Sequence, residues 1–395
     1  MTLLAQTPVT VEFMSQHENL SSDRIQPREV FSKLPKYAAG KPPRAVEGLT
    51  QYKLSSNENP YGPVPAVRDV IRTFETANRY PDPLCTRLRG ALGEHLGVDP
   101  ADIVTGAGSL GALGQILAAF AGGNTDGSQD EVIYPWRSFE AYPIVTGLAG
   151  AKEVRVPNLP NGEHDLDAML AAITDRTRVI ILCTPNNPTG PALTQRKVRD
   201  FMAKVPSRIV VILDEAYLEF CQASELNETE IAEGGLAEGM DLYPDYDNMV
   251  LLRTFSKAAG LAGLRVGYSV SHPEVTQYLR VAATTFAVTA VAEEAAITSI
   301  EHHEEVLEQV RRLVSERTRV VEGLAEQGWR IPVTRANFVW LPLGERTQEF
   351  AEVADAHALS VRAFGNEGVR VSIGEDEANT RFLQIAEQFR ERVER

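Results

Sequence analysis

The sequence is poor in cysteine, in positive charge and in long apolar runs. Only 3 of its 395 residues are cysteine, and this odd, widely spaced set indicates a reducing, cytoplasmic setting without a disulfide framework. There are 39 Lys and Arg residues against 54 Asp and Glu residues, a formal net charge of −15. This acidic balance disfavours nucleic acid and anionic membranes as partners. No apolar run reaches the ~18 residues that a membrane-spanning helix needs.

Metal-ligand spacing and a secretory signal are also missing. The seven histidines form no ligand pattern, and the adjacent His302 and His303 would point about 100° apart on a helix. We therefore expect no metal site. Residues 1–25 have neither a basic start nor an apolar core, so we expect a polar arm rather than a secretory signal.

From about residue 50 onward, short apolar segments alternate with helical patterns. Several of these segments are continuous Val, Ile and Leu runs, which is typical of strands buried on both faces. The alternation predicts an α/β fold with a mostly parallel central sheet and helices on both sides. The expected strands are 102–106, 131–135, 152–157, 178–185, 208–217, 249–256 and 265–270.

The last third of the chain has a different composition and a different apolar pattern. There is no Gly or Pro between Glu274 and Glu322, and apolar residues from Val306 to Val314 share one helical face. This pattern predicts a long helix that leads out of the first domain. The segments after it predict a smaller α+β domain. Nine acids and no Lys or Arg lie between Glu219 and Asp247; we expect a solvated insertion loop, with a cation or partner site as the alternative.

A glycine-rich turn, "GAGSLG" from Gly106 to Gly111, follows one predicted strand and precedes a helical pattern. It fits the dinucleotide pattern G-x-G-x-x-G. A dinucleotide site also needs an acid at the end of the next strand, whereas Asp130 and Glu131 stand at its start. The turn still predicts backbone N–H groups and a helix N-terminus for a phosphate. Glycines that only serve helix packing are the alternative.

Two further motifs follow apolar strands. "CTPNNPTG", residues 183–190, combines turn residues with two uncharged amide side chains at a strand's carboxyl end, where open α/β sheets bind ligands. An ordinary turn is the alternative. In "VVILDEAY", Asp214 ends a strand. A carboxylate there is costly unless it meets a cation, either in a structural ion pair or on a ligand.

The segment "RTFSKAAGLAGLRVGY" places Lys257 and Arg265 among small and apolar residues. A desolvated lysine is a nucleophile at neutral pH, and an arginine suits a phosphate; a lysine that reaches the surface is the alternative. Together, the phosphate turn, the amide turn, Asp214 and Lys257 predict one ligand with a phosphate, a basic ring nitrogen and a carbonyl. That ligand is pyridoxal phosphate.

The order of these motifs, G-x-G-S, P-N-N-P-T-G, D-E-A-Y, T-F-S-K and A-G-L-R-x-G-Y, resembles fold-type I aminotransferases of the histidinol-phosphate aminotransferase family. The resemblance covers roughly residues 30–390. Segments 135–143, 336–350 and 361–374 resemble the aromatic amino acid (phenylalanine) aminotransferase branch more closely. Histidinol-phosphate aminotransferases usually carry an acid after the Gly-Ser turn, where this chain has Leu110 and Gly111, which favours the aromatic branch.

The resemblance implies a role for each site residue. Lys257 would hold the cofactor covalently and act as the base, Asp214 would pair with the ring nitrogen, and Tyr217 would complete the catalytic set. Phe139 would stack on the ring, and Asn187 would join Tyr217 at its phenolic oxygen. The expected phosphate ligands are Ala107, Gly108, Ser109, Thr254, Ser256 and Arg265, with Tyr61 reaching the cofactor of the partner subunit in a homodimer. The expected substrate ligands are Arg370 for the carboxylate, and Arg362, Tyr37 and Asn337 for the other end.

The implied reaction is transamination between an aromatic amino acid and 2-oxoglutarate. The implied domains are an N-terminal arm at 1–55 that joins the small domain, a large cofactor-binding domain at 56–285 and a small domain at 286–395. Histidinol phosphate is the alternative donor. An NAD dehydrogenase would leave Lys257 and Asp214 without a role, and a cofactor-sensing regulator would need a DNA-binding module that the net charge of −15 disfavours.

Overall fold

The computed structural model describes residues 25–37 and 40–394. Residues from Pro35 onward form one compact unit, and the described residues before it, 25–34, contain α1 (Val30–Lys33). The predicted polar arm lies almost wholly outside the described residues. No helix in the described ranges is long and apolar enough to cross a membrane.

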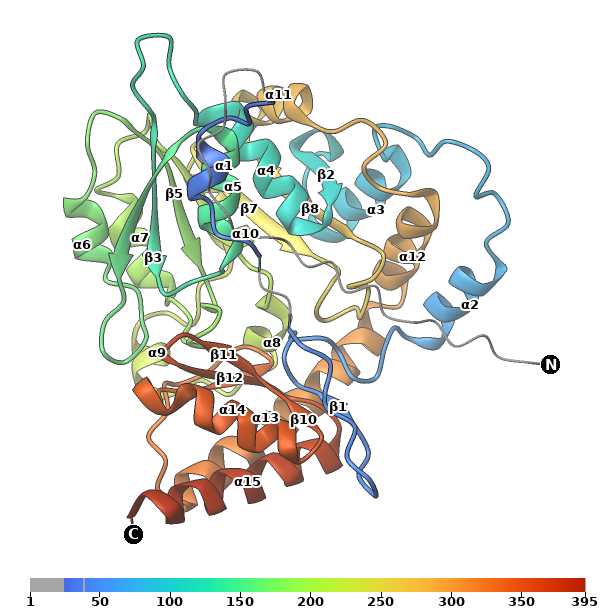
Figure 1. Cartoon of the computed structure of the whole chain (residues 1–395). Coiled ribbons are helices and arrows are strands. Elements are labelled where there is room, and N and C mark those ends of the chain that lie inside the picture. The colour runs from blue at the N-terminus through green and yellow to red at the C-terminus, as the bar shows by residue number, and fades with distance from the viewer. Residues whose placement is uncertain (1–24, 38–39, 395) are drawn as a thin grey trace. The chain divides into compact units, whose positions relative to one another are not determined.

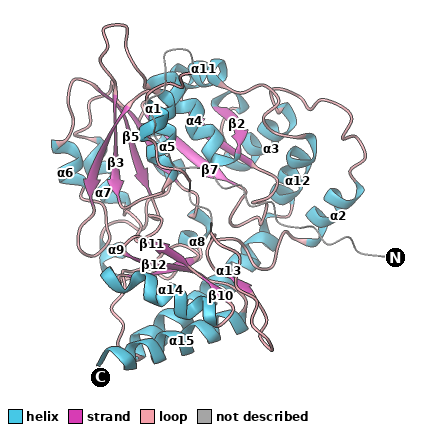
Figure 2. Cartoon of the chain, in the orientation of Figure 1, coloured by secondary structure: helices cyan, strands magenta, loops and turns pink. Residues whose placement is uncertain are grey.

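A seven-stranded sheet forms the first part of the larger unit (Figures 1 and 2). Its order is β2-β8-β7-β6-β5-β3-β4, and β8 alone runs antiparallel to its neighbours within this sheet. All seven predicted strands and the mostly parallel pairing are confirmed. The segment 208–217 was predicted too long, because its strand ends at Asp214. The strands are β2 (Ile103–Ala107), β3 (Glu131–Trp136), β4 (Lys152–Pro157), β5 (Thr177–Cys183), β6 (Val210–Asp214), β7 (Met249–Thr254) and β8 (Val266–Ser271).

Helices cover both faces of this sheet. Successive strand residues point to opposite sides: Val211 and Leu213 of β6 join one apolar core, and Val210 and Ile212 join the other. The second core is covered by α4 (Gly108–Phe120), α5 (Ala141–Ala149) and α11 (Pro273–Ala282). The first is covered by α2 (Pro65–Thr73), α3 (Thr86–Leu96), α6 (Leu166–Ala171), α7 (Gln195–Met202) and α12 (Ala290–Glu301).

The C-terminal part has its own small antiparallel sheet, ordered β11-β12-β9, with α14 packed on it and α15 beside α13 (Figure 1). Two residues of β1 pair with β10, so the chain near residue 52 joins this part. The elements are β1 (Tyr52–Lys53), α13 (His303–Glu326), β9 (Phe338–Leu341), α14 (Thr347–Ala356), β10 (Leu359–Ser360), β11 (Arg362–Phe364), β12 (Gly368–Ser372) and α15 (Asp376–Glu394). The predicted α+β character is confirmed, and the domain boundaries stay a prediction.

The predicted long helix corresponds to α13, and the expected apolar face is buried at Val306, Val310, Leu313 and Val314. The helix does not extend back through the whole Gly-free and Pro-free span. Instead, α13 begins at His303, directly after α12 ends at Glu301, and α11 ends at Ala282, before Thr289, whose side chain accepts a hydrogen bond from the α12 backbone. A capping threonine can therefore start a new helix without a preceding Gly or Pro.

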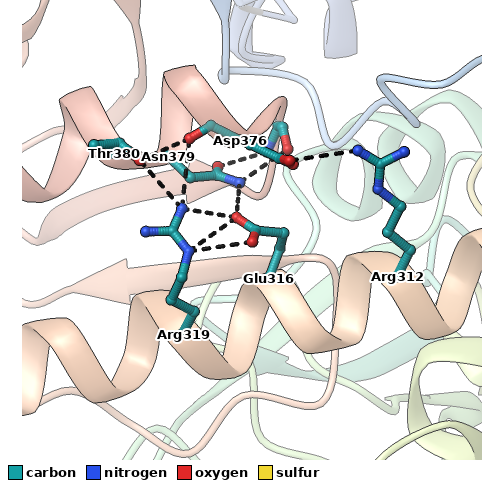
Figure 3. Close-up of polar contacts among 7 residues, drawn as sticks. Arg312, Glu316, Arg319, Asp376, Asn379 and Thr380 are labelled. Carbon is teal, nitrogen blue, oxygen red and sulfur yellow. Dashed lines mark hydrogen bonds and ion pairs between the residues drawn. The ribbon is translucent and has the colours of Figure 1, made fainter.

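A polar network joins α13 to the start of α15 (Figure 3). Asn379 is buried and binds both backbone groups of Gly374 at 2.9 Å. It also donates to Glu316 at 3.1 Å, and Arg319 holds the same carboxylate in a bidentate contact. Because Gly374 lies two residues beyond β12, this network fixes the end of the strand that carries Arg370.

The acidic segment 219–247 is more ordered than a solvated loop, so that expectation is wrong in part. It contains α8 (Leu218–Gln222), α9 (Glu228–Ala232) and α10 (Gly239–Leu242). Glu230 pairs with Arg335 at 2.6 Å, and Glu233 with Arg196 at 2.7 Å. The basic partners lie elsewhere in the sequence, which is why a local charge count does not reveal them. In the described parts of the chain, no group of His, Cys, Asp and Glu is arranged to hold a metal ion.

The Glu230–Arg335 pair gives a stability prediction. Both side chains are almost fully buried, so Glu230→Ala leaves an uncompensated guanidinium and should lower the free energy of unfolding by about 3 kcal/mol. Denaturant unfolding measures this loss. The matched control is Glu228→Ala, an exposed position on the same helix, which should change the stability by under ~0.5 kcal/mol. Equal effects of the two substitutions would contradict the role of the buried pair.

Candidate active site

A cavity of about 340 Å³ lies where β5, β6 and β7 end. Cys183, Asp214 and Thr254, the last residues of these strands, line it. Parallel strands in one sheet place their carboxyl ends at the same edge, so polar residues far apart in sequence meet there. The small sheet supplies the opposite wall through Arg362, Phe364 and Arg370.

Lys257 projects into this cavity from the segment after β7. Its amine donates to the backbone oxygen of Ser56 at 3.3 Å, and no carboxylate among the described residues forms an ion pair with it. Burial lowers the pKa of Lys257 to about 7, and the positive charge of Arg370 contributes further to this shift. A substantial fraction of the amine is therefore neutral near pH 7, as a nucleophile or base requires.

Asp214 lies at the end of β6 and accepts a hydrogen bond from the Tyr142 hydroxyl at 2.7 Å. Burial raises the pKa of Asp214 to about 6, and the bond from Tyr142 partly opposes this shift. No cation of the described chain pairs with this carboxylate. A cationic ligand atom placed beside it would return it fully to the charged form.

A cradle for an anion lies at the start of α4. Gly108 has φ +71°, and a Cβ there would collide with the guanidinium of Arg265, so only glycine allows this approach. Arg265 donates to Ser256 Oγ at 3.2 Å and to the backbone oxygen of Ala262 at 3.0 Å, both uncharged acceptors. Ser109 and Thr254 also line the cavity here. Hydroxyls, a guanidinium and a helix N-terminus together suit a phosphate.

Asn187 and Tyr217 face the same cavity as Arg370. Arg370 donates to Asn187 Oδ1 at 2.6 Å and to the Ser55 backbone oxygen at 2.7 Å, while its buried Nε has no hydrogen-bond partner among the described residues. The Tyr217 hydroxyl accepts from Asn57 Nδ2 at 2.9 Å. Burial lowers the pKa of Arg370 and raises that of Tyr217. A carboxylate would satisfy the unpaired face of the guanidinium.

The structure thus brings most of the predicted site residues to one cavity: Tyr37, Ser109, Phe139, Asn187, Asp214, Tyr217, Thr254, Ser256, Lys257, Arg265, Arg362 and Arg370. Ala107 and Gly108 lie behind the cradle, where Ala107 accepts from Arg265 through its backbone oxygen. Asn337 lies one layer further back and donates to the Asn57 backbone oxygen at 3.3 Å. Tyr61 is not part of the cavity wall; Arg312 stacks on its ring at 4.2 Å.

Sequence reasoning missed four contributors. Asn57 supports Tyr217, Tyr142 supports Asp214, Glu140 pairs with Arg362 at 2.6 Å, and Ser56 receives the Lys257 amine. Asn57 has φ +52°, a left-handed conformation, and its place in "SSNENPYG" was the available signal. No signal in the sequence pairs Glu140 with Arg362, because 222 positions separate them.

The residues present fit pyridoxal 5′-phosphate. This cofactor needs an amine for its aldehyde, an acid for its ring nitrogen and an anion cradle for its phosphate. Lys257, Asp214 and the cradle of Ser109, Ser256 and Arg265 supply these three features around one cavity. The buried carboxylate without a cationic partner is the specific sign, because such a group is costly until a cation meets it.

Comparisons with known proteins agree with this geometry. The sequence model of the family described as aminotransferase class I and II matches residues 50–385. An aromatic amino acid aminotransferase of Streptomyces coelicolor is 47% identical over 361 residues, which covers 91% of this chain and 96% of that protein. One of Cutibacterium acnes is 46% identical, covering 93% and 99%. The solved histidinol-phosphate aminotransferase of Sinorhizobium meliloti, in complex with pyridoxal-5′-phosphate, has a TM-score of 0.74 at 25% identity and covers 85% and 91% of the two chains.

We expect Lys257 to titrate near pH 7 in the cofactor-free protein, because burial lowers its pKa to about 7 from the ordinary 10.5. The amine is charged and unreactive below this pH and becomes neutral above it. Its acetylation by acetic anhydride, followed by peptide mass spectrometry, should have its midpoint there, with exposed Lys204 as the reference for reagent activity. Arg370→Gln should raise the midpoint, because it removes a positive charge. A midpoint close to 10.5 would show that Lys257 is solvated.

Proposed function

Because the chain belongs to the class I and II aminotransferases, a family that uses pyridoxal 5′-phosphate, we propose that it transfers the amino group of an aromatic amino acid to 2-oxoglutarate. The products are the aromatic 2-oxo acid and glutamate. The two relatives at 47% and 46% identity, both named aromatic amino acid aminotransferases, support this donor class. The acceptor rests on the resemblance found in the sequence.

The proposal rests on one observation, which is that a buried amine and a buried guanidinium line the same cavity. Lys257 supplies the amine, and Arg370 supplies a cation that no carboxylate of the described chain neutralises. Every amino acid and 2-oxo acid carries one carboxylate next to its reacting carbon, and a planar fork binds such a group in a fixed orientation. Phe139, Phe364 and Leu110 add apolar surface for an aromatic side chain.

The chain's own groups divide the work of the reaction. When bound, pyridoxal phosphate supplies an aldehyde carbon and an electron-withdrawing ring. Lys257 holds the aldehyde end and, as a neutral amine, accepts the proton from the Cα of the donor. Asp214 keeps a proton on the ring nitrogen, and Tyr142 holds this carboxylate in place. Arg370 fixes the α-carboxylate of donor and acceptor in turn, so one cation serves both halves of the reaction.

We also propose a homodimer. Tyr80 and Phe286 stack at 4.9 Å between ring centroids although both are exposed in the single chain, and exposed aromatic pairs are typical of interfaces. In the single chain the Tyr61 hydroxyl is buried and has no hydrogen-bond partner among the described residues, and Arg312 stacks on its ring. Contact between Tyr61 and a partner's cofactor therefore requires a rearrangement around Arg312.

Replacing Lys257 tests the reaction itself. Lys257→Ala should still take up pyridoxal phosphate, because the cradle and Asp214 remain, but its turnover of phenylalanine with 2-oxoglutarate should fall by about 10,000-fold. Glutamate formation measures turnover, and retained cofactor after desalting measures uptake. Lys204→Ala, at an exposed position, is the matched control. Normal turnover by the Lys257 variant would exclude transamination at this site.

Replacing Asp214 tests the ring-nitrogen contact. Asp214→Asn keeps the shape of the side chain but removes its negative charge, so kcat for phenylalanine should fall about 100- to 1,000-fold. Tyr142→Phe removes only the hydrogen bond to this carboxylate and should cost about 10-fold or less. If Asp214→Asn leaves kcat unchanged, another group must stabilise the ring charge.

A further inference from the structure

Two arginines stand side by side in the wall of the cavity. Arg362 of β11 and Arg370 of β12 are directly opposite each other in the antiparallel pairing, and both line the cavity. Phe364 packs against both guanidinium groups, with 5.4 Å from Arg362 and 5.6 Å from Arg370 to its ring centroid. Like charges in this cross-strand position are unfavourable, and burial together with the charge of Arg362 lowers the pKa of Arg370.

Glu140 compensates one of these two charges. Its carboxylate accepts from Arg362 Nη2 at 2.6 Å, and the pair is mostly buried, with side-chain exposures of 12% for Arg362 and 28% for Glu140. Glu140 is the N-cap residue of α5, yet its side chain makes no capping hydrogen bond. The carboxylate therefore faces the cavity instead of the helix end. It directly follows Phe139, the residue expected against the cofactor ring.

The charges divide the substrate pocket into two regions. The formal charges of Arg370, Arg362 and Glu140 add up to +1. This net charge is located at Arg370, where an α-carboxylate is expected. Around Arg362 and Glu140 the sum is zero, and Phe364 and Tyr37 add aromatic surface. A neutral side chain can enter this region without breaking the ion pair between Arg362 and Glu140. A second anionic group must compete with Glu140 for the Arg362 guanidinium.

We propose that Glu140 is a specificity-determining residue, which neutralises Arg362 and so favours substrates with one carboxylate and an uncharged side chain over substrates with a second anionic group. The disfavoured class contains dicarboxylates and amino acids whose side chain carries a phosphate ester. This inference rests on the proposed function, since it takes Arg370 as the carboxylate site. It also implies that the dicarboxylate acceptor binds more weakly than the cavity would otherwise allow.

Binding to the holoenzyme tests the inference without turnover. The probes are glutarate, with two carboxylates, and 3-phenylpropionate, with one carboxylate and a neutral ring. Glu140→Gln should lower the dissociation constant of glutarate by about 10-fold, because the full charge of Arg362 becomes available. The dissociation constant of 3-phenylpropionate should change by less than about 2-fold. Calorimetric titration gives both values.

Two further variants separate a local charge effect from a general one. Glu233→Gln removes an acid that pairs with Arg196 at 2.7 Å, and neither residue lines this cavity, so this variant should leave the ratio of the two constants unchanged. Adding Arg362→Gln to Glu140→Gln should abolish the gain for glutarate. An unchanged ratio in Glu140→Gln, or the same shift in Glu233→Gln, would overturn the inference.

Turnover separates this inference from the proposed function. In wild-type protein, phenylalanine should be a better donor than aspartate, which carries a second carboxylate, and Glu140→Gln should raise kcat/KM for aspartate about 10-fold relative to phenylalanine. If wild-type protein transaminates neither donor, the proposed function fails, and the binding ratio still decides the role of Glu140. If phenylalanine is turned over but the relative kcat/KM does not change in Glu140→Gln, only the role of Glu140 fails.

Discussion

Burial of charge without an opposite charge is the constraint on which the site depends. Lys257, Asp214 and Arg370 are all taken out of water, and none of them has an ion-pair partner within the described chain. Each isolated charge in such a place destabilises the empty protein, because no neighbour replaces the lost hydration. A ligand that carries the missing charges recovers this free energy on binding. The same unpaired charges that destabilise the empty site therefore strengthen its binding of a charged cofactor.

The rest of the fold serves to hold these groups in place. Parallel strands deliver Asp214 and the segment before Lys257 to one edge of the large sheet, and α4 starts at the same edge with its N–H groups toward the cavity. The small sheet contributes Arg370 from β12, whose end is fixed by the contacts of Asn379 with Gly374. Ion pairs between residues far apart in the sequence, such as Glu230 and Arg335, stabilise the segments that connect the two sheets.

Local patterns in the sequence predicted the parts of this arrangement that are themselves local. The apolar runs gave all seven strands of the large sheet, and residues at strand ends, such as Asp214 and Asn187, reach the cavity as expected. Interactions between distant residues could not be predicted in the same way. The support of Asp214 by Tyr142 depends on how α5 packs, and the pairing of the acidic segment depends on arginines outside it. The start of α12 is marked by the capping side chain of Thr289, which an apolar period does not reveal.

The contacts of Asn57 have a consequence for the order of events during synthesis of the chain. Its side chain links Tyr217, 160 positions away, to Ser372, 315 positions away. Closing such long loops costs chain entropy that is recovered only when all three segments are present. The strands of the large sheet all lie before residue 272, but the link from Tyr217 through Asn57 to Ser372, and the place of Arg370, are complete only when β12 has been made. The site is therefore one of the last features that the growing chain can complete.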